Sequence, residues 1–485
     1  MNRHNFFKQH CVAGVAFSLL QLSAVAQLGS AYPNAPSSSQ SSTFSVPLTN
    51  RQNPFNGSVA QEKLVPGSRP LSFKDAIDLA LKNNLGVLLQ SDQSLAARGQ
   101  KWKELAGLLP NLTAEINENI VQENLAALGL RIPGFPTIIG PFGYFDARAY
   151  LKQSVFDLNA INRVKSASAS ERAAELSYKD ARDLVVLAVG NAYLQTLAGA
   201  ARVETAEAQV QTAQALFDKA DDQLKAGVSP AIDSLRAKVE FQSRQQQAIV
   251  ARNDYAKQKL ALLRAIGLPT GQEITLTDQA PYEPLVTAGF EEDLRRAYLS
   301  RFDYLSAAQQ LRAAEYSRKA ATAKYFPDVS ISANYGDLGV NVGNSHGTYT
   351  VAGGIHIPIF EGGKTQGEVM QSEATLRQSR QQLEDIRAQV EYDVRVAFLD
   401  LAAAKEQVEV ARSTVDLANQ TMIQARDRFT AGVTDNLEVV QAQEAVASAN
   451  ESYISSLYAH NLAKVSLARA IGFAEQGVKE YLKSK

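Results

Sequence analysis

The 485-residue sequence predicts a mainly α-helical protein whose few strands form part of a membrane β-barrel. Three observations lead to this prediction. One helical pattern is about six times as long as an ordinary globular helix. The folded part of the chain is a tandem duplication, and each copy contains two runs in which apolar and polar residues alternate. Together they indicate long helical hairpins and four transmembrane strands per chain.

The long helical pattern covers residues 364–431 and contains no proline. Its apolar positions follow the alternating spacing of four and three that is typical of a coiled coil. These positions are Val390, Val394, Ala397, Leu401, Ala404, Val408, Ala411, Val415, Ala418, Met422, Ala425 and Phe429. A helix of this length spans roughly 100 Å. Alanine at every second position lets neighbouring helices approach closely, so we expect this helix to pack into a wall of helices.

The first 26 residues are predicted to be a secretory signal peptide. Arg3 and Lys8 supply positive charge, an apolar run follows, and residues 24–26 form an A-x-A cleavage site. The alternative is a membrane anchor, but the apolar run is too short to span a bilayer. Cys11, the single cysteine, leaves with this segment, so the mature chain is expected to contain no disulfide.

Composition restricts the remaining chain. Residues 27–70 are rich in Ser and Pro and are predicted to be extended or disordered. The 49 basic and 50 acidic residues give no basic excess, which argues against binding nucleic acid. After residue 26 there is no apolar run of 18 residues, so no transmembrane helix is predicted. An exported chain of this kind is periplasmic, extracellular or inserted in the outer membrane as a barrel.

The duplication appears in two similar segments, LKAGVSPAIDSLRAK from Leu224 and FTAGVTDNLEVVQAQ from Phe429. The first repeat is predicted to cover residues 71–268 and the second residues 290–473. Residues 269–289 form an equatorial linker with a short strand expected at 273–276, and residues 474–485 form a C-terminal tail. The first copy has additional residues, placed in an extended loop at 132–143 because Pro and Gly are frequent there.

Each copy is predicted to contain a helix, two strands, a very long helix, a tight turn and a last helix. The first helix is expected to begin at the N-cap Ser72 and to run unbroken to about Gly107. The strands are expected at about 111–122, 144–156, 328–337 and 347–360, each close to the length that a tilted membrane strand needs. Four strands cannot close a barrel, so two chains would give 8 strands or three chains 12. The alternative is a soluble sheet that packs on a core.

These features resemble the TolC-like outer-membrane efflux family, and the resemblance covers about residues 70–473. It implies a homotrimer with a 12-stranded barrel in outer-membrane lipid and an α-helical barrel in the periplasm. It also implies a periplasmic adaptor protein and an inner-membrane pump as partners. The chain would then be the passive exit duct of a tripartite efflux or type I secretion system. Two family features differ, since Leu85 and Phe302 stand where the family often has proline.

The resemblance also implies a periplasmic gate just after the second tight turn. Its first acidic position falls on Glu438, and its second falls on Gln441, which is not acidic. Asp435 lies in the same segment, and Asp233 is the weaker equivalent in the first copy. In a trimer Glu438 would form a ring of three like charges that binds cations and raises its own pKa. The alternative is that Glu438 is an ordinary solvated helix residue.

Docking of the adaptor is expected at the two tight turns, Ala226-Gly227-Val228 and Ala431-Gly432-Val433, where small and apolar residues are exposed. Glycine is also needed there to end each long helix, so a purely conformational role stays open. Asp435 is expected to cap the helix that follows the second turn.

No sequence motif for catalysis, nucleotide binding or a metal site was found, so no cofactor and no enzymatic activity are predicted. His460 falls on an apolar helical seam and is expected to be a packing residue. Two other functions remain as alternatives. One is a periplasmic coiled-coil scaffold without channel activity, and the other is a simple diffusion porin.

Overall fold

The computed structural model describes residues 55, 57–60, 62–127, 129–130, 132–278, 282–285, 289–434 and 436–481, the last four by their backbone alone. The chain divides into two units, Met1–Asn50 and Arg51–Lys485, and all described residues belong to the second. The predicted signal peptide, most of the segment 27–70 and Asp435 lie outside the described residues.

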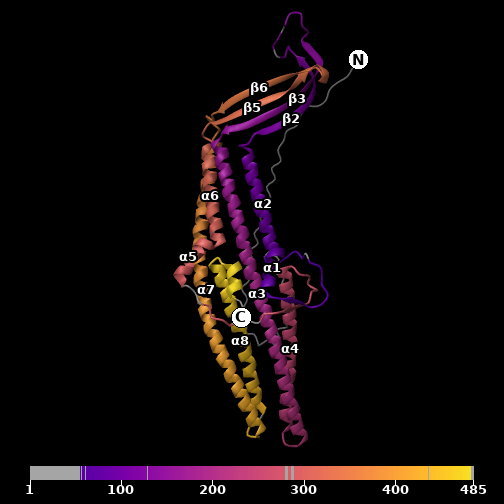
Figure 1. The fold of residues 1–485 in the computed structure, drawn as a ribbon, viewed down its shortest axis with the longest axis vertical. Coiled ribbons are helices and arrows are strands. Elements are labelled where there is room, and N and C mark those ends of the chain that lie inside the picture. The colour runs from indigo at the N-terminus through magenta and orange to yellow at the C-terminus, as the bar shows by residue number, and fades with distance from the viewer. Residues whose placement is uncertain are drawn as a thin grey trace, which may run out of the picture. The chain divides into compact units, whose positions relative to one another are not determined.

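Two copies with the same order of elements make up the second unit (Figure 1). The first copy contains α1 (Phe73–Asn83), α2 (Leu85–Ala106), β2 (Asn111–Asn124), β3 (Ile138–Phe156), α3 (Leu158–Lys225) and α4 (Ala231–Ile266). The second contains α5 (Phe290–Ser300), α6 (Phe302–Ala323), β5 (Asp328–Gly339), β6 (Ser345–His356), α7 (Lys364–Thr430) and α8 (Asn436–Ala470). A parallel pair joins β1 (Arg69–Leu71) to β4 (Ile274–Leu276), and the tail residues form α9 (Ala474–Tyr481). A short 3-10 helix, Val342–Asn344, connects β5 to β6.

The first helix of each copy is interrupted, contrary to the unbroken helix expected from Ser72 to Gly107. Ser72 caps α1 as predicted, accepting a hydrogen bond from the amide of Asp75 at 3.2 Å. The backbone of Asn84 is extended, and its side chain caps α2 by accepting from the amide of Gly86 at 2.9 Å. Arg301 is extended in the same way between α5 and α6. These residues end one helix and begin the next without a proline.

The strands form one antiparallel sheet in the order β2-β3-β5-β6. The register places Leu112, Leu151, Ala333 and Val351 in one row across the sheet, so the apolar positions of all four strands share a face. Leu112 and Val351 are exposed in this single chain. One face of the sheet is therefore apolar and uncovered by the described residues.

Two strand boundaries differ from the prediction by more than two residues. β3 begins at Ile138 inside the predicted loop, because residues 138 and 139 pair with Asn124 and Glu123 beyond an irregularity in β2. β6 ends at His356 instead of residue 360. Its partner β5 begins at Asp328, which pairs with His356, so residues 357–360 have no partner strand in the described chain.

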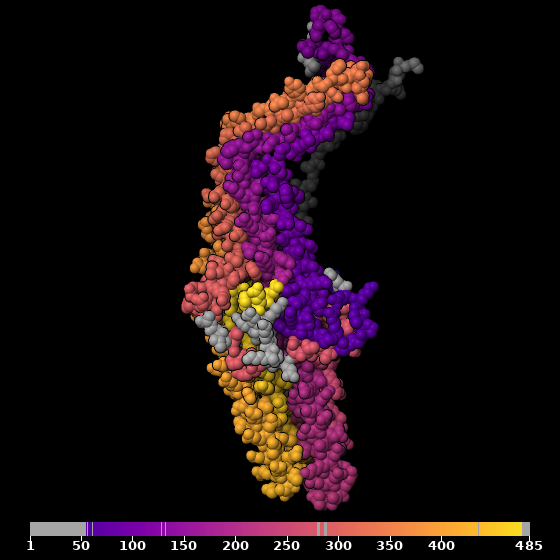
Figure 2. All heavy atoms as spheres, in the orientation of Figure 1, coloured from indigo at the N-terminus to yellow at the C-terminus, as the bar shows by residue number. Residues whose placement is uncertain are grey.

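The helices pack as the heptad seam predicted. Ten of the twelve seam positions of α7 are buried, and Val415 and Met422 are half-buried. α3 contacts α2, α4, α6 and α8, whereas α7 contacts α5, α6 and α8. In Figure 2 the hairpin α3/α4, in magenta, lies beside the hairpin α7/α8, in orange and yellow.

Among the described residues, one helix, α3, is long and apolar enough to cross a membrane. Just over half of that apolar stretch is buried within the fold. Val185, Val189 and Tyr193 belong to the main hydrophobic core together with residues of α1 and α4. The apolar residues of α3 are therefore explained by their packing against α1 and α4 in this core.

Charged groups hold α9 against the middle of α3. Arg182 binds Glu475 with its Nη2 at 2.8 Å from Oε1, and the backbone amide of Glu475 donates to Asp183. Burial raises the pKa of Asp183 to about 6, although the charge of Arg469 opposes this shift. Asp183 Oδ2 accepts no hydrogen bond from the described residues. The ionised form of Asp183 is therefore unfavourable in the folded state.

We expect Asp183→Asn to stabilise the protein at pH 7.5 and to have little effect at pH 4. The folded pKa lies above the ordinary value of 3.8, so ionised Asp183 costs stability above pH 6, and protonation removes this cost at lower pH. A difference of about two pKa units corresponds to about 3 kcal/mol at most. Thermal unfolding at both pH values measures the effect, with the exposed Asp222→Asn as the control. An Asn variant less stable than the wild type at pH 7.5 would contradict the assignment.

Candidate functional site

The two tight turns have the same backbone geometry. Gly227 and Gly432 have φ values of 75° and 70°, in the left-handed region that favours glycine. The amide of Val228 donates to the carbonyl of Gln223, and that of Val433 to the carbonyl of Arg428, each at 3.0 Å. These bonds satisfy carbonyl groups that the ends of α3 and α7 would otherwise leave free.

Each turn exposes the side chain that follows its glycine. Val228 and Val433 are 74% and 70% exposed, and the alanines before the glycines are also exposed. A Cβ atom on either glycine would have no neighbour within 4 Å. A larger side chain would therefore fit at both glycine positions without a clash. Glycine is favoured there because its φ is positive. The exposed valines are the side chains that a partner could contact.

Glu438 lies in the first turn of α8 and is half-exposed, whereas Gln441 is exposed one turn later. The carboxylate of Glu438 faces Arg428 at the end of α7, with Oε1 3.6 Å from Nη1. This ion pair connects the two helices of one hairpin across the tight turn. Glu438 is therefore not simply a solvated helix residue, because Arg428 is a charged partner that the sequence did not indicate.

Asp233 lies in a different environment from Glu438. It is buried at the start of α4, where its carboxylate accepts a hydrogen bond from Ser229 at 3.1 Å. Its backbone carbonyl accepts a hydrogen bond at 3.2 Å from the side-chain amide of Asn436, the first residue of α8. Asn436 is 1% exposed. The structure thus brings the predicted residue Asp233 to the second repeat through Asn436.

Further contacts join the two hairpins near their turns. Lys219 Nζ donates to Thr430 Oγ1 at 2.8 Å and lies over the ring of Phe429. A small apolar cluster connects α3 with α7 and α8 and contains Leu216, Ala425, Phe429, Val439 and Ala442. Sequence reasoning found the seam positions of this cluster. It missed Lys219, Thr430 and Asn436, whose contacts depend on how the repeats pair. It also missed Arg428, whose contact depends on how the two helices of one hairpin face each other.

The described residues contain no group of three or more His, Cys, Asp or Glu side chains that could hold a metal ion. His460 is buried, as its seam position predicted, and contacts the ring of Tyr282. Burial and the charge of Lys464 lower the pKa of His460 to about 4. His460 is therefore neutral at physiological pH and serves packing.

A family model described as outer membrane efflux protein matches residues 76–268 and 294–473, most of both repeats. The chain belongs to the outer membrane efflux protein family. This confirms the family resemblance drawn from the duplicated pattern and identifies an outer-membrane protein.

Two relatives and one solved structure illustrate the range of this outer membrane efflux family. The toluene efflux pump outer membrane protein TtgC of Pseudomonas putida is 28% identical over 423 residues, 83% of each chain. The alkaline protease secretion protein AprF of Pseudomonas aeruginosa is 22% identical over 406 residues, 79% of this chain and 82% of AprF. The CmeC outer membrane channel of Campylobacter jejuni shares the fold, with a TM-score of 0.72, 16% identity and coverage of 89% and 95%.

Proposed function

We propose that the chain is a passive exit duct, not an enzyme, in a tripartite efflux or type I secretion system of the outer membrane. An inner-membrane pump supplies the energy, and a periplasmic adaptor connects that pump to the duct. The observation that carries this proposal is the family match across both repeats. TtgC is named for toluene efflux and AprF for protease secretion, so we assign no cargo class to the chain.

The functional assembly is a homotrimer with a shared barrel of 12 strands. In the described chain the sheet ends on one side at β2 and on the other at β6. Open sheet edges are not tolerated in lipid. Pairing β6 of one copy with β2 of the next removes both edges. It also continues the apolar face, whose exposed residues include Leu112, Ile116, Ile120, Tyr349 and Ile355.

Exposed apolar residues on the helices support the same head-to-tail assembly. α7 leaves Leu399, Val410 and Leu417 exposed along one helix. Leu95 and Trp102 on α2 and Val239 on α4 are also exposed. Neither α2 nor α4 is among the main contacts of α7 within the chain. Packing α7 against α2 and α4 of the next copy covers both sets, and such contacts close into a ring.

The gate and the docking surface lie at the helical turns. Glu438 narrows the entrance with Gln441 beside it, and Asp233 supports it through Asn436. Asp435 belongs to the same segment but lies outside the described residues. Val228 and Val433, exposed beside their glycines, are the docking contacts for the adaptor.

Mass measurement and planar-bilayer conductance of the detergent-extracted protein test this function. We expect a trimer with small, cation-preferring currents that multivalent cations reduce. Glu438→Ala should increase the current and weaken the cation preference, because it removes three carboxylates and leaves Arg428 unpaired at each turn. Gln441→Ala, which shortens a neighbouring side chain of the gate and removes no charge, separates the effect of charge from the effect of side-chain size. Currents unchanged by Glu438→Ala would exclude Glu438 from the gate, whereas no current from any form would refute the duct.

A further inference from the structure

The apolar face of the four-stranded sheet has an acidic boundary near the β5–β6 connection. Asp337 of β5 lies on this face, two residues beyond Tyr335, which pairs with Tyr349 of β6. Glu118 of β2 lies on the same face, one row further toward the strand connections. Both carboxylates are exposed, and neither forms an ion pair with a described residue. Because ionised carboxylates are costly in hydrocarbon, the lipid contact of this face begins at the two tyrosines.

The paired part of β6 is too short to fill the apolar layer of a membrane. Its side chains on the apolar face run from Tyr349 to Ile355, and the strand ends at His356. These six steps cover about 20 Å along the strand, or about 15 Å of membrane thickness at a tilt of about 40°. An outer-membrane barrel presents an apolar band about 25 Å tall. About 10 Å of that band is therefore missing from the paired strand.

Residues beyond the paired strand supply the missing apolar surface. Ile357 and Ile359 continue the alternation of β6, and both are exposed, Ile359 to 94%. The ten steps from Tyr349 to Ile359 cover about 33 Å, or about 25 Å of thickness at the same tilt. The apolar face therefore reaches the height of a membrane band only when it includes Ile359.

The neighbouring strand and helix ends carry exposed aromatic residues near this level. A register shift in β3 places Phe156 opposite Val329 on the apolar face, and Phe156 is partly exposed. Tyr325 and Phe326, both exposed, stand between the end of α6 and β5. The residue before them is Lys324, the C-cap of α6. Aromatic rings followed by a basic residue are typical of the interface between hydrocarbon and lipid headgroups.

Assembly of several chains leaves this surface uncovered. Neighbouring strands join through backbone groups that lie in the plane of the sheet. The alternation of β6 makes Ile357 and Ile359 project from the face of the sheet, so edge pairing does not bury them.

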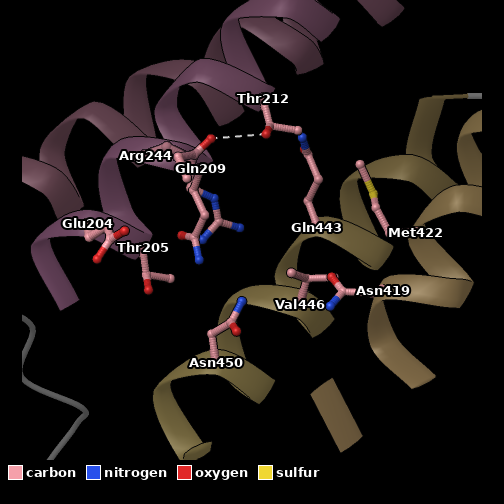
Figure 3. A pocket seen from close by; sticks show the side chains of 11 residues that line it. Glu204, Thr205, Gln209, Thr212, Arg244, Asn419, Met422, Gln443, Val446 and Asn450 are labelled. Atoms are coloured by element: carbon pink, nitrogen blue, oxygen red, sulfur yellow. Dashed lines mark hydrogen bonds between the residues drawn. The ribbon is translucent and has the colours of Figure 1, made fainter. Parts of the chain in front are cut away.

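The helical hairpins enclose polar groups instead. A cavity of about 380 Å³ lies where the hairpin α3/α4 meets the hairpin α7/α8 (Figure 3). The residues that line it include Gln209, Thr212, Asn419, Gln443 and Asn450. Amide and hydroxyl groups favour contact with water, so this part of the chain suits the periplasm and not lipid.

We propose that phospholipids of the inner leaflet of the outer membrane cover a junction surface formed by Phe156, Tyr325, Ile357 and Ile359. The hydrocarbon boundary then lies at Ile359 and not at His356, the last paired residue. The end of α6 and the start of α7 stand in the headgroup layer. This inference rests on the proposed barrel, since it requires the apolar face of the sheet to contact lipid.

Quenching of tryptophan fluorescence by brominated phosphatidylcholine tests the boundary in vesicles. Trp102 is the single tryptophan of the sequence, so each probe is introduced together with Trp102→Phe. Ile359→Trp should lose more fluorescence to lipid brominated near the headgroup than to lipid brominated deep in the acyl chain. Ile355→Trp, close to the middle of the band, should show the opposite order. Trp102 of the unaltered chain, exposed on α2, is the control outside the membrane and should lose none to either lipid.

Three results would overturn the inference, and they separate it from the proposed function. Quenching of Ile355→Trp without quenching of Ile359→Trp would leave the barrel in lipid but end the membrane contact with the paired strands, or show that another chain covers Ile359. Stronger quenching of Ile359→Trp by the deep bromines would place it near the bilayer centre. Absence of quenching at both positions would remove the lipid face, and with it the proposed barrel. The mass of each variant in detergent, equal to that of the unaltered chain, controls for assembly.

Discussion

Arg301→Ala lowers the free energy of unfolding by about 3–5 kcal/mol, the cost of breaking a buried ion pair by removing one partner. Arg301 is 4% exposed at the break between α5 and α6. Its Nη2 lies 2.6 Å from Asp303 Oδ2, and its Nη1 lies 2.8 Å from Asp393 Oδ2 on α7. Without the guanidinium, the half-buried carboxylates of Asp303 and Asp393 lose the cation that they share, and one charged link to α7 is lost.

The pH dependence of this loss follows from Asp303. Burial alone would raise the pKa of Asp303, but its hydrogen bond to Arg301 and the charges of Arg469 and Arg301 outweigh burial and lower it. A lowered folded pKa contributes stability above the ordinary value of 3.8, and this contribution disappears as the pH falls through the folded pKa. The deficit of Arg301→Ala should therefore persist at pH 4 and become smaller only below pH 3.8, so the comparison is made between pH 2.5 and pH 7.5.

Denaturant unfolding of the detergent-extracted protein at both pH values measures these effects. Arg295→Ala is the matched control, since Arg295 lies on α5 in an exposed ion pair with Glu292. Exposed pairs of this kind contribute about 0–1 kcal/mol. Arg301→Lys should lie between the wild type and the alanine variant, because an ammonium group keeps the charge without the planar fork. Equal stability of the Arg301→Ala and Arg295→Ala variants would contradict the assignment.

Asn436→Ala is expected to increase the mean current of the duct by the largest factor of any substitution at the turns. Its side-chain amide donates to the carbonyl of Asp233, so it connects α8 of the second repeat to α4 of the first. Losing one hydrogen bond costs about 1 kcal/mol per chain. If three chains open together, the opening equilibrium shifts by about 100-fold. The mean current cannot exceed the current of a duct that is open all the time, so the observed increase is limited by that value.

Bilayer recording of Asn436→Ala beside two other variants checks this expectation. Lys219→Met removes the bond to Thr430 and should give a smaller increase, because that bond lies at the surface. Thr421→Ala is the control, since Thr421 is exposed and its hydroxyl donates to the carbonyl of Leu417 in the same helix. A current from Asn436→Ala no larger than that from Thr421→Ala would show that the contact with Asp233 does not restrain opening.

The sequence by itself determined the repeated plan of this protein. The heptad seam of α7, the positive-φ glycines of the turns and the alternating strands each depend on local periodicity or on backbone conformation, which are readable along one stretch of chain. The positions of proline residues did not reveal where the helices are interrupted. Asn84 and Arg301 interrupt helices where the pattern looked continuous, because a side-chain cap and an extended backbone replace the proline.

Only the tertiary structure decided how the candidate site is built. It pairs Glu438 with Arg428 and joins Asn436 to Asp233. The Asn436 contact spans 203 residues of sequence, so no local period records it. Such contacts depend on the relative rotation and height of packed helices. The apolar seam restricts how two helices can rotate and slide against each other, but it does not determine which polar side chains come into contact.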